Sequence, residues 1–307
     1  MYQKETGEFI MGVDHGYSTI KTVDTIMKNG VKKCSSKPAM DENTLFWQGK
    51  YFKTGEGNMD FAESKVDDDR MYINTLAAIG RAAKKYQCFR MNVILGTGLP
   101  FARHGEEKET FRRYFLRNRI DEFEYEGWRV NVNIKAVYVF KQGYAAAYGK
   151  LRGKDADCYL VDIGSRTLDC VHIRNGMALE SDSFTQQDGL RYVYQKIREA
   201  VYAKTGKSIP DARIDDYISG IEGSMASEYE HIIQEKLQDY AAHVEGLLCE
   251  HNIEFDFHRV VYVGGGASIM DKYAKHRSGN VECWTDVREN ARGYEHALID
   301  RCEKGML

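Results

Sequence analysis

Two acidic glycine turns stand at matching places in the two halves of the sequence. Asp14 and Gly16 follow one apolar run, and Asp162 and Gly164 follow another. A carboxylate at the end of a strand can hold Mg²⁺ or its waters, while a turn that glycine permits points backbone N–H groups at an anion. Lys21 lies seven residues after Asp14 and suits a phosphate as its counter-charge. The pattern therefore predicts phosphate chemistry at two loops.

The second turn continues as Asp-x-Gly-x-x-Thr-x-Asp, which adds Thr167 and Asp169 at fixed offsets. Two roles remain open for Asp169: catalysis, or a structural hydrogen bond to the loop. A third element, VGGGAS over residues 263–268, places three glycines where backbone can approach a nucleotide closely. Neither GxGxxG nor GxxxxGK[ST] occurs in the sequence, which disfavours Rossmann dinucleotide binding and P-loop chemistry.

Each acidic turn is followed by an Asn-Gly pair at a similar distance. Asn29-Gly30 comes 15 residues after Asp14, and Asn175-Gly176 comes 13 residues after Asp162. Asn-Gly between apolar runs predicts a β-hairpin, because both central residues must adopt positive φ. A chance pair of hairpins is one interpretation, but the matched acidic turns favour an internal duplication.

Composition bounds the class of protein. The 307 residues are enough for two domains or one large one, and 43% hydrophobic with 29% charged residues is ordinary for a globular chain. The net charge of −3 gives no basic footprint for direct nucleic-acid binding. With no apolar run of about 20 residues and a polar start, a soluble, intracellular (cytoplasmic) protein is expected. The seven scattered cysteines contain no CxxC pair, so free thiols and no structural metal are expected.

Helical and strand-like patterns alternate through most of the chain, which predicts an α/β protein. Strands are expected over residues 91–95 and 260–263. Helices are expected over residues 69–86, 104–119, 188–204, 225–250 and 287–303, with a further small-residue helix within 137–150.

Taken together, the two acidic turns and the later glycine loop resemble the actin, Hsp70 and sugar-kinase ATPase superfamily. Within it, the chain looks most like the bacterial actin-like proteins of the ParM type, which segregate plasmids. The residues that carry this resemblance are 14–21 (DHGYSTIK), 162–169 (DIGSRTLD), 95–100 (LGTGLP) and 142–147 (QGYAAA).

The resemblance implies a two-lobed, actin-like α/β ATPase fold that encloses Mg·ATP, each lobe with a mixed sheet flanked by helices and a small subdomain insertion. Lobe I is expected over residues 1–150, with a helix at 285–307 returning to it and a small subdomain at about 31–68. Lobe II is expected over residues 151–284, with a small helical subdomain at about 190–255.

The resemblance also implies residue roles. Asp14 and Asp162 would be catalytic and would hold Mg²⁺ through water, and Lys21 would contact the β-phosphate. Gln142 would orient the attacking water, although an exposed helix residue or a helix cap remains the alternative. The implied nucleotide-binding set is Gly16, Tyr17, Ser18, Lys21, Gly164, Ser165, Arg166, Thr167, Gly189, Gly264, Gly265, Gly266 and Ala267.

The function implied is an ATP hydrolase that polymerises with Mg·ATP and loses subunits after hydrolysis. Its partners would be further copies of itself and a DNA-binding adaptor of a plasmid partition system, with no direct contact to nucleic acid or membrane. A small-molecule kinase of the sugar type is the main alternative, because the same superfamily contains such enzymes. A chaperone would need a substrate-binding domain beyond residue 307, and a non-enzymatic scaffold would not need intact aspartates and glycines.

Overall fold

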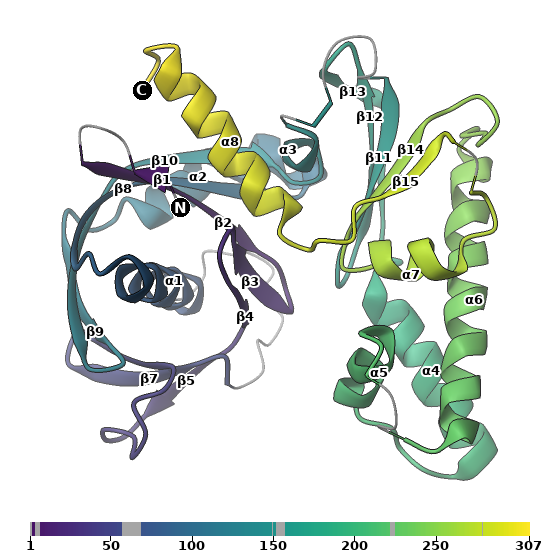
Figure 1. The fold of residues 1–307 in the computed structure, drawn as a ribbon, viewed down its shortest axis with the longest axis horizontal. Helices are drawn as coiled ribbons and strands as arrows, with labels where there is room; N and C mark the ends of the chain where they lie inside the picture. The colour runs from purple at the N-terminus through teal and green to yellow at the C-terminus, as the bar shows by residue number, and fades with distance from the viewer. Residues whose placement is uncertain are drawn as a thin grey trace. The chain divides into compact units, whose positions relative to one another are not determined.

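The chain folds into two compact units, residues 1–150 with 288–307, and residues 151–287 (Figure 1). The computed structural model describes residues 2–3, 7–56, 69–148, 150–151, 157–221, 225–277 and 279–307. Part of the small subdomain expected at 31–68 therefore lies outside the described residues.

The first unit is a ten-stranded sheet, ordered β4-β3-β2-β8-β10-β9-β6-β7-β5 with β1 added beside β2. Its strands are β1 (Tyr2–Gln3), β2 (Glu8–His15), β3 (Thr19–Thr22), β4 (Ile26–Lys28), β5 (Val31–Cys34), β6 (Thr44–Trp47), β7 (Lys50–Thr54), β8 (Arg90–Leu99), β9 (Asp121–Tyr125) and β10 (Trp128–Lys141). Its helices are α1 (Arg70–Tyr86), the 3-10 turn η1 (Phe101–Arg103), α2 (His104–Phe115), α3 (Tyr144–Ala147) and α8 (Glu289–Glu303).

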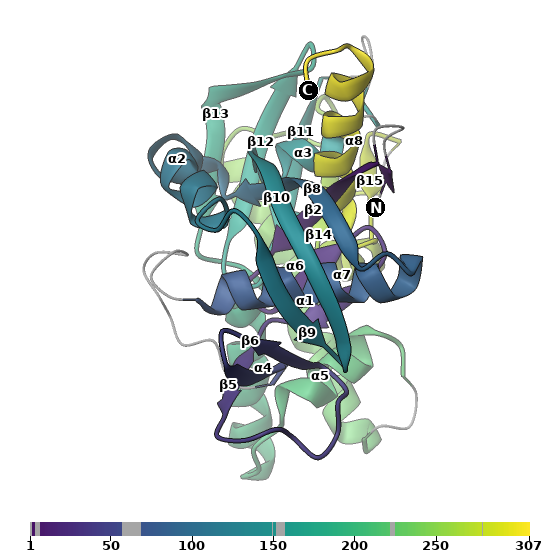
Figure 2. The same cartoon turned by 90° about the vertical axis from the view of Figure 1, so that its left-hand side faces the viewer.

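The sheet curls around α1, which Figure 1 shows end-on inside it and Figure 2 shows running behind β9 and β10. Central strands are buried on both faces as a result. Phe9 and Met11 of β2 face the cluster that contains α1, whereas Ile10 between them packs with Leu298 of α8. The alternation of side chains along β2 thus fixes the strand between two helices.

Helix α8 approaches the sheet where glycines leave room. A Cβ on Gly12 of β2 would lie 2.0 Å from the carbonyl oxygen of Ala291, and one on Gly96 of β8 would lie 2.9 Å from Cβ of Tyr294. On α8 itself, a Cβ on Gly293 would lie 1.7 Å from the carbonyl oxygen of Ala145 in α3. These contacts hold β2, β8 and α3 in place against one helix.

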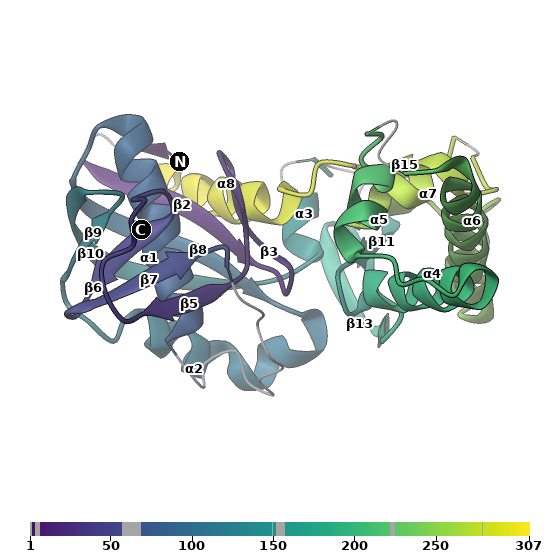
Figure 3. The same cartoon turned by 90° about the horizontal axis from the view of Figure 1, so that it is seen from below.

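The second unit is a five-stranded sheet, ordered β13-β12-β11-β14-β15, with helices packed on one face (Figure 3). Its strands are β11 (Cys158–Ile163), β12 (Leu168–Arg174), β13 (Met177–Gln186), β14 (Val260–Gly264) and β15 (Val281–Cys283). Its helices are α4 (Leu190–Thr205), α5 (Asp211–Ile218), α6 (Ser227–Glu250) and α7 (Ala267–Tyr273).

The same strand arrangement occurs in both units, which supports the predicted duplication. β2 pairs antiparallel with β3 and parallel with β8, and β11 pairs antiparallel with β12 and parallel with β14. In both sheets, two further strands extend the pattern in the same sense, β4 and β10 in the first and β13 and β15 in the second.

One of the two predicted Asn-Gly hairpins is wrong. Asn175 and Gly176 have φ of 50° and 74° and join β12 to β13, as predicted. Asn29 and Gly30 do not have positive φ, and the strands that flank them pair elsewhere, β4 with β3 and β5 with β7. The physical reason is that the Asn29 side chain is buried and hydrogen-bonded to Gly16. At this point the chain passes from β4, at one end of the strand order, to β5, at the other end.

Other elements differ from the expectation in extent. Residues 137–141 continue strand β10, whose alternating Val137 and Val139 are buried, so the small-residue helix is limited to α3. Helix α2 ends at Phe115 rather than residue 119. Helix α5 was not expected, and it begins directly after Pro210, whose fixed φ suits a helix start. In the described parts of the chain, none of the helices is long and apolar enough to cross a bilayer.

We predict that Gly12→Ala lowers the free energy of unfolding by about 3 kcal/mol, the upper end of the usual cost of overpacking, because its Cβ would meet backbone rather than a movable side chain. The matched control is Gly105→Ala in α2, where a Cβ would meet nothing within 4 Å. Urea unfolding followed by circular dichroism measures both. A Gly12→Ala protein as stable as the control would contradict the close approach of α8.

Candidate functional site

In the first unit, three parallel strands end at one edge of the sheet and bring the first acidic turn to it. Asp14 stands at the end of β2, Leu99 ends β8, and Gln142 directly follows β10. The backbone N–H of Gln142 donates to the carbonyl oxygen of Leu99 at 2.8 Å, which holds these two strand ends together.

The Asp14 carboxylate is 2% exposed and is contacted on both oxygens. Lys21 lies directly opposite it in the β2–β3 ladder, with Nζ 3.3 Å from Oδ2, and Gln142 donates from Nε2 to Oδ1 at 2.8 Å. The seven-residue spacing of Asp14 and Lys21 thus places the two residues across a tight hairpin. A buried carboxylate requires such partners, because burial without them costs several kcal/mol.

The loop that follows is short and requires glycine at one position. A Cβ on Gly16 would lie 2.8 Å from the carbonyl oxygen of Thr19 and 3.2 Å from Nζ of Lys21, so only glycine leaves space beside the ammonium group. Tyr17 is half-buried and Ser18 is exposed at the tip. Gln142 is half-buried beside Asp14 and is not an exposed helix residue.

In the second unit, Asp162 stands near the end of β11 and is nearly buried. Its cross-strand neighbour is Asp169, where the first unit has Lys21. Both oxygens of Asp169 accept hydrogen bonds, from the hydroxyl of Thr167 at 2.8 Å and from that of Thr185 at 2.6 Å. A structural hydrogen bond to the loop was the alternative to a catalytic role for Asp169. The hydrogen bond from Thr167, a residue of the loop, is of this kind. They also offset the cost of placing two acids opposite each other.

The loop after Asp162 is fastened to the start of α4. The carbonyl oxygens of Gly164, Ser165 and Arg166 accept hydrogen bonds from the first N–H groups of that helix at 2.9–3.1 Å. A Cβ on Gly189, at the helix start, would lie 2.4 Å from the carbonyl carbon of Arg166. Gly189 therefore allows close packing of the helix on the loop.

The glycine run meets the second acidic turn, because β14 is parallel to β11 and pairs Gly264 with Ile163. Gly264 has φ of +83°, and a Cβ there would lie 2.3 Å from Oδ1 of Asp162. Gly266 donates from its N–H to the carbonyl oxygen of Ile163 at 3.0 Å and leaves no room for a side chain. Ala267 is buried in the core, so its side chain is not presented to a ligand.

Two observations bear on whether the residues of each turn suit Mg²⁺ and a nucleotide. Gly16 and Gly264 let the backbone of each turn lie directly against a charged group, since a Cβ on Gly16 would lie 3.2 Å from Nζ of Lys21 and one on Gly264 would lie 2.3 Å from Oδ1 of Asp162. Among the described residues, no group of three or more His, Cys, Asp or Glu side chains converges. Asp14 and Asp162 each supply carboxylate oxygens at a turn, and Mg²⁺ is usually held by one or two carboxylates with waters and phosphate oxygens.

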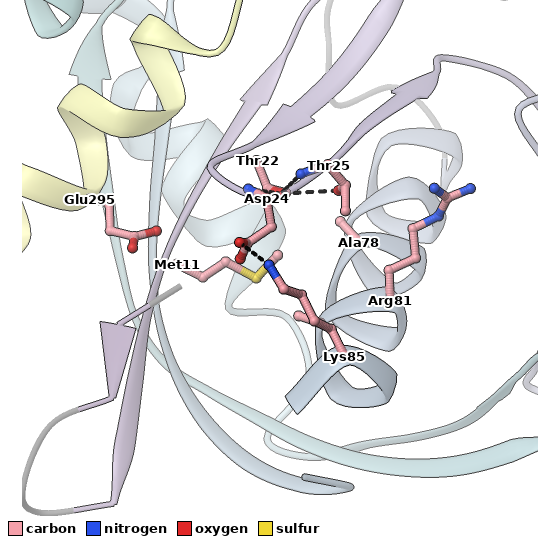
Figure 4. A pocket seen from close by; sticks show the side chains of 9 residues that line it. Met11, Thr22, Asp24, Thr25, Ala78, Arg81, Lys85 and Glu295 are labelled. Carbon is pink, nitrogen blue, oxygen red and sulfur yellow. Dashed lines mark hydrogen bonds and ion pairs between the residues drawn. The ribbon is translucent and has the colours of Figure 1, made fainter. Parts of the chain in front are cut away.

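The predicted residues line neither of two hollows found elsewhere. Figure 4 shows a cavity of about 10 Å³ in the first unit, between Met11, Ala78 and Glu295, which has room for about one water molecule. Burial raises the pKa of Glu295. Asp24 lines the same cavity. Burial alone would raise the pKa of its carboxyl group, but the hydrogen bonds from Lys85 and Tyr86 outweigh that effect and lower this pKa to about 2. The other hollow, of about 430 Å³, lies between α4 and α6.

Sequence reasoning missed several polar residues that hold the two loops. They are His15, Asn29, Asn74, Thr185 and Asn290. A signal existed for Asn74, since an Asn-Thr pair interrupts the apolar part of the helix pattern over residues 69–86. No local signal marks Asn290, whose Oδ1 accepts from the N–H of Gly143 at a separation of 147 residues.

Comparison with known proteins places this geometry in a known fold. Residues 160–275 match the family described as archaeal actin homologue MreB-like, C-terminal. Similar solved structures include the apo ParM protein of pSK41, at TM-score 0.72 and 16% identity over 97% of this chain and 98% of that one. The archaeal actin homologue Ta0583 in complex with ADP gives TM-score 0.72 at 20% identity, over 95% of this chain and 99% of that one. No curated protein sequence matches the chain.

A 15-stranded ParM filament from Clostridium botulinum is also similar, at TM-score 0.71 and 15% identity over 95% of this chain and 99% of that one. The chain therefore has the actin-like α/β fold, and the predicted fold class is confirmed. The predicted resemblance to ParM-type actin-like proteins is confirmed as a likeness of fold.

We predict that Gly264→Ala costs about 2 kcal/mol of unfolding free energy, since positive φ strains an alanine and its Cβ would displace the Asp162 carboxylate. Gly265→Ala is the matched control. Its Cβ would meet only the end of the Leu190 side chain, at 3.0 Å, so we expect a cost below about 1 kcal/mol. Urea unfolding measures the loss of unfolding free energy in both variants. Equal losses would contradict the steric constraint described for Gly264.

Proposed function

We propose that this chain is an ATP hydrolase that polymerises into homopolymeric filaments with Mg·ATP and loses subunits after hydrolysis. One observation carries the proposal: each unit ends its central strand in a buried carboxylate followed by a glycine turn, at equivalent places in two equivalent sheets. Phosphoryl transfer depends mainly on positioning and charge neutralisation, which such paired loops supply.

The proposed roles follow from the contacts of each residue. Bound Mg·ATP would supply the phosphoanhydride that is cleaved and a cation that neutralises its charge. Asp14 and Asp162 would hold Mg²⁺ through its waters, and Lys21 would neutralise the β-phosphate. Because Nε2 of Gln142 donates to Asp14, its carbonyl oxygen is the group left to accept a proton of the attacking water.

Backbone would make the remaining contacts to the nucleotide. Gly16, Gly164 and Thr167 would line the phosphates, and Gly264 to Gly266 would lie against adenosine, where positive φ and the lack of side chains allow close approach. The loop residues Tyr17, Ser18, Ser165 and Arg166 remain candidates through their backbone N–H groups.

Filament formation is supported by likeness to proteins that form filaments, among them the 15-stranded ParM filament and the Alp12 filament. We propose that a filament of this chain moves plasmid DNA through a DNA-binding adaptor. The net charge of −3 favours an adaptor over direct contact with DNA.

The first test is sedimentation and electron microscopy of the purified protein with Mg·ATP, with Mg·ADP and without nucleotide. We expect ATP-dependent filaments that disappear as phosphate is released. A small-molecule kinase would give no polymer and would pass phosphate to an acceptor. Absence of any ATP-dependent polymer would therefore overturn the filament proposal.

The second test concerns the water-orienting residue. Gln142→Ala should slow phosphate release about ten- to a thousandfold, a barrier increase of roughly 1.4–4 kcal/mol, while ATP binding is largely kept. Its filaments should persist longer in a light-scattering time course. Asn133→Ala on the exposed part of β10 is the control and should behave as wild type. Mutant filaments that collapse as fast as wild type would exclude this role.

The third test concerns the metal. Asp162→Ala should abolish Mg²⁺-dependent phosphate release while circular dichroism stays native, because a carboxylate at a loop edge adds little to the core. Phosphate release is followed against Mg²⁺ concentration for both proteins. Turnover at the wild-type rate in the folded variant would remove Asp162 from the site.

A further inference from the structure

Helix α1 carries two polar residues, Asn74 and Thr75, in its fully buried, mostly apolar part. The curled sheet encloses the helix, and Asn74 and Thr75 are both 0% exposed (Figure 1). A helix buried all round is normally apolar all round. The two polar side chains therefore need a physical reason.

Asn74 is connected to the first acidic turn through one intermediary. Its Nδ2 donates to Oδ1 of Asn29 at 2.8 Å, and Nδ2 of Asn29 donates to the carbonyl oxygen of Gly16 at 2.7 Å. The backbone N–H of Asn29 also donates to the carbonyl oxygen of Ser18 at 2.9 Å. Asn29 thus spans the loop and holds the peptide groups on both sides of Tyr17.

Thr75 is connected to the same turn through His15, the residue between Asp14 and Gly16. The imidazole Nε2 lies 2.7 Å from the hydroxyl of Thr75, and Nδ1 lies 2.9 Å from the hydroxyl of Thr97 in β8. The ring stacks on Phe115 with centroids 5.1 Å apart. With a hydroxyl at each nitrogen and an aromatic ring on its face, the His15 side chain has one orientation.

Burial of these side chains is costly for the core alone. A buried amide or hydroxyl destabilises the fold unless it is hydrogen-bonded, whereas leucine and valine would fill the same space without that cost. The Oδ1 atom of Asn74 is buried and has no hydrogen-bond partner among the described residues. Asn74 therefore favours one conformation of the loop at the expense of the core, whereas the Thr75 hydroxyl is satisfied by His15 and by the carbonyl oxygen of Met71.

We propose that Asn74 and Thr75 are positioning residues that fix residues 14–18 in the conformation that binds nucleotide, acting through Asn29 and His15. The inference rests on the proposed function, because its expected consequence is a change in nucleotide affinity. A loop that is already ordered pays less entropy on binding, so its loosening lowers affinity even though neither residue touches the ligand.

The experiment compares Asn74→Leu and Thr75→Val with Ile79→Val, a control that is equally buried on the same helix. Three quantities are measured: the urea unfolding midpoint, hydrogen exchange of the peptide covering residues 14–22 without nucleotide, and the dissociation constant for Mg·ATP. Thr75→Ser is added because it keeps the hydroxyl and loses the methyl group.

We expect Asn74→Leu and Thr75→Val to speed loop exchange at least tenfold and to weaken Mg·ATP binding about ten- to a hundredfold, the range set by loss of one or two buried hydrogen bonds. Ile79→Val should lower the unfolding midpoint and leave the other two quantities unchanged. Thr75→Ser should keep wild-type exchange and affinity despite its packing defect.

Three results would overturn the inference. The first is loop exchange in Asn74→Leu and Thr75→Val no faster than in Ile79→Val, the second is faster exchange without loss of affinity, and the third is a Thr75→Ser protein that behaves as Thr75→Val does. If wild-type protein does not bind Mg·ATP at all, the proposed function fails. Loop exchange then still decides whether α1 orders residues 14–18.

Discussion

Each unit must keep a carboxylate nearly buried at the end of its central strand, and much of the surrounding structure satisfies that requirement. Asp14 is held by the ammonium group of Lys21 and by the amide of Gln142, which come from the neighbouring hairpin strand and from β10. Removing Lys21 would leave the buried carboxylate without a counter-charge, at a cost of several kcal/mol. Because Gln142 follows β10 and lies 128 residues from Asp14, its hydrogen bond also fixes how β2 and β10 end relative to one another.

Packing keeps that edge of the sheet in place from both faces. Helix α1 fills the inside of the curled sheet of the first unit, and α8 lies on the outside, where Gly12 and Gly96 let its backbone approach. The strands are thus fixed along their length, and the turns at their ends carry glycine where a Cβ would collide with neighbouring atoms. Helices α1 and α8 therefore fix the positions of the strand ends at this edge, although neither contributes a residue predicted to touch the nucleotide.

The two acidic turns share a backbone plan but differ in electrostatics. Opposite the first aspartate stands Lys21, and opposite the second stands Asp169, whose oxygens accept from Thr167 and Thr185. The chain resembles actin homologues in the same way. At 15–20% identity over nearly the whole chain, the fold is similar although most residues differ. Between the two units of this chain, strand order and the glycine after each aspartate are shared, whereas the residue opposite each aspartate differs in charge.

The sequence by itself determined the features that depend on neighbouring residues. The α/β class, the hairpin at Asn175-Gly176 and the helices expected over 69–86, 188–204 and 225–250 follow from periodicity and turn chemistry, and the structure confirms them within two residues at each end. Only the tertiary structure decided what Asn29 does: its amide is used to hold Gly16 and Asn74, so no hairpin forms there. The pairing of Gln142 with Asp14, 128 residues apart, and the approach of α8 to Gly12, are set by parallel strand register and by backbone proximity. Such contacts leave no periodic trace in the sequence, since each involves one residue on each of two distant segments.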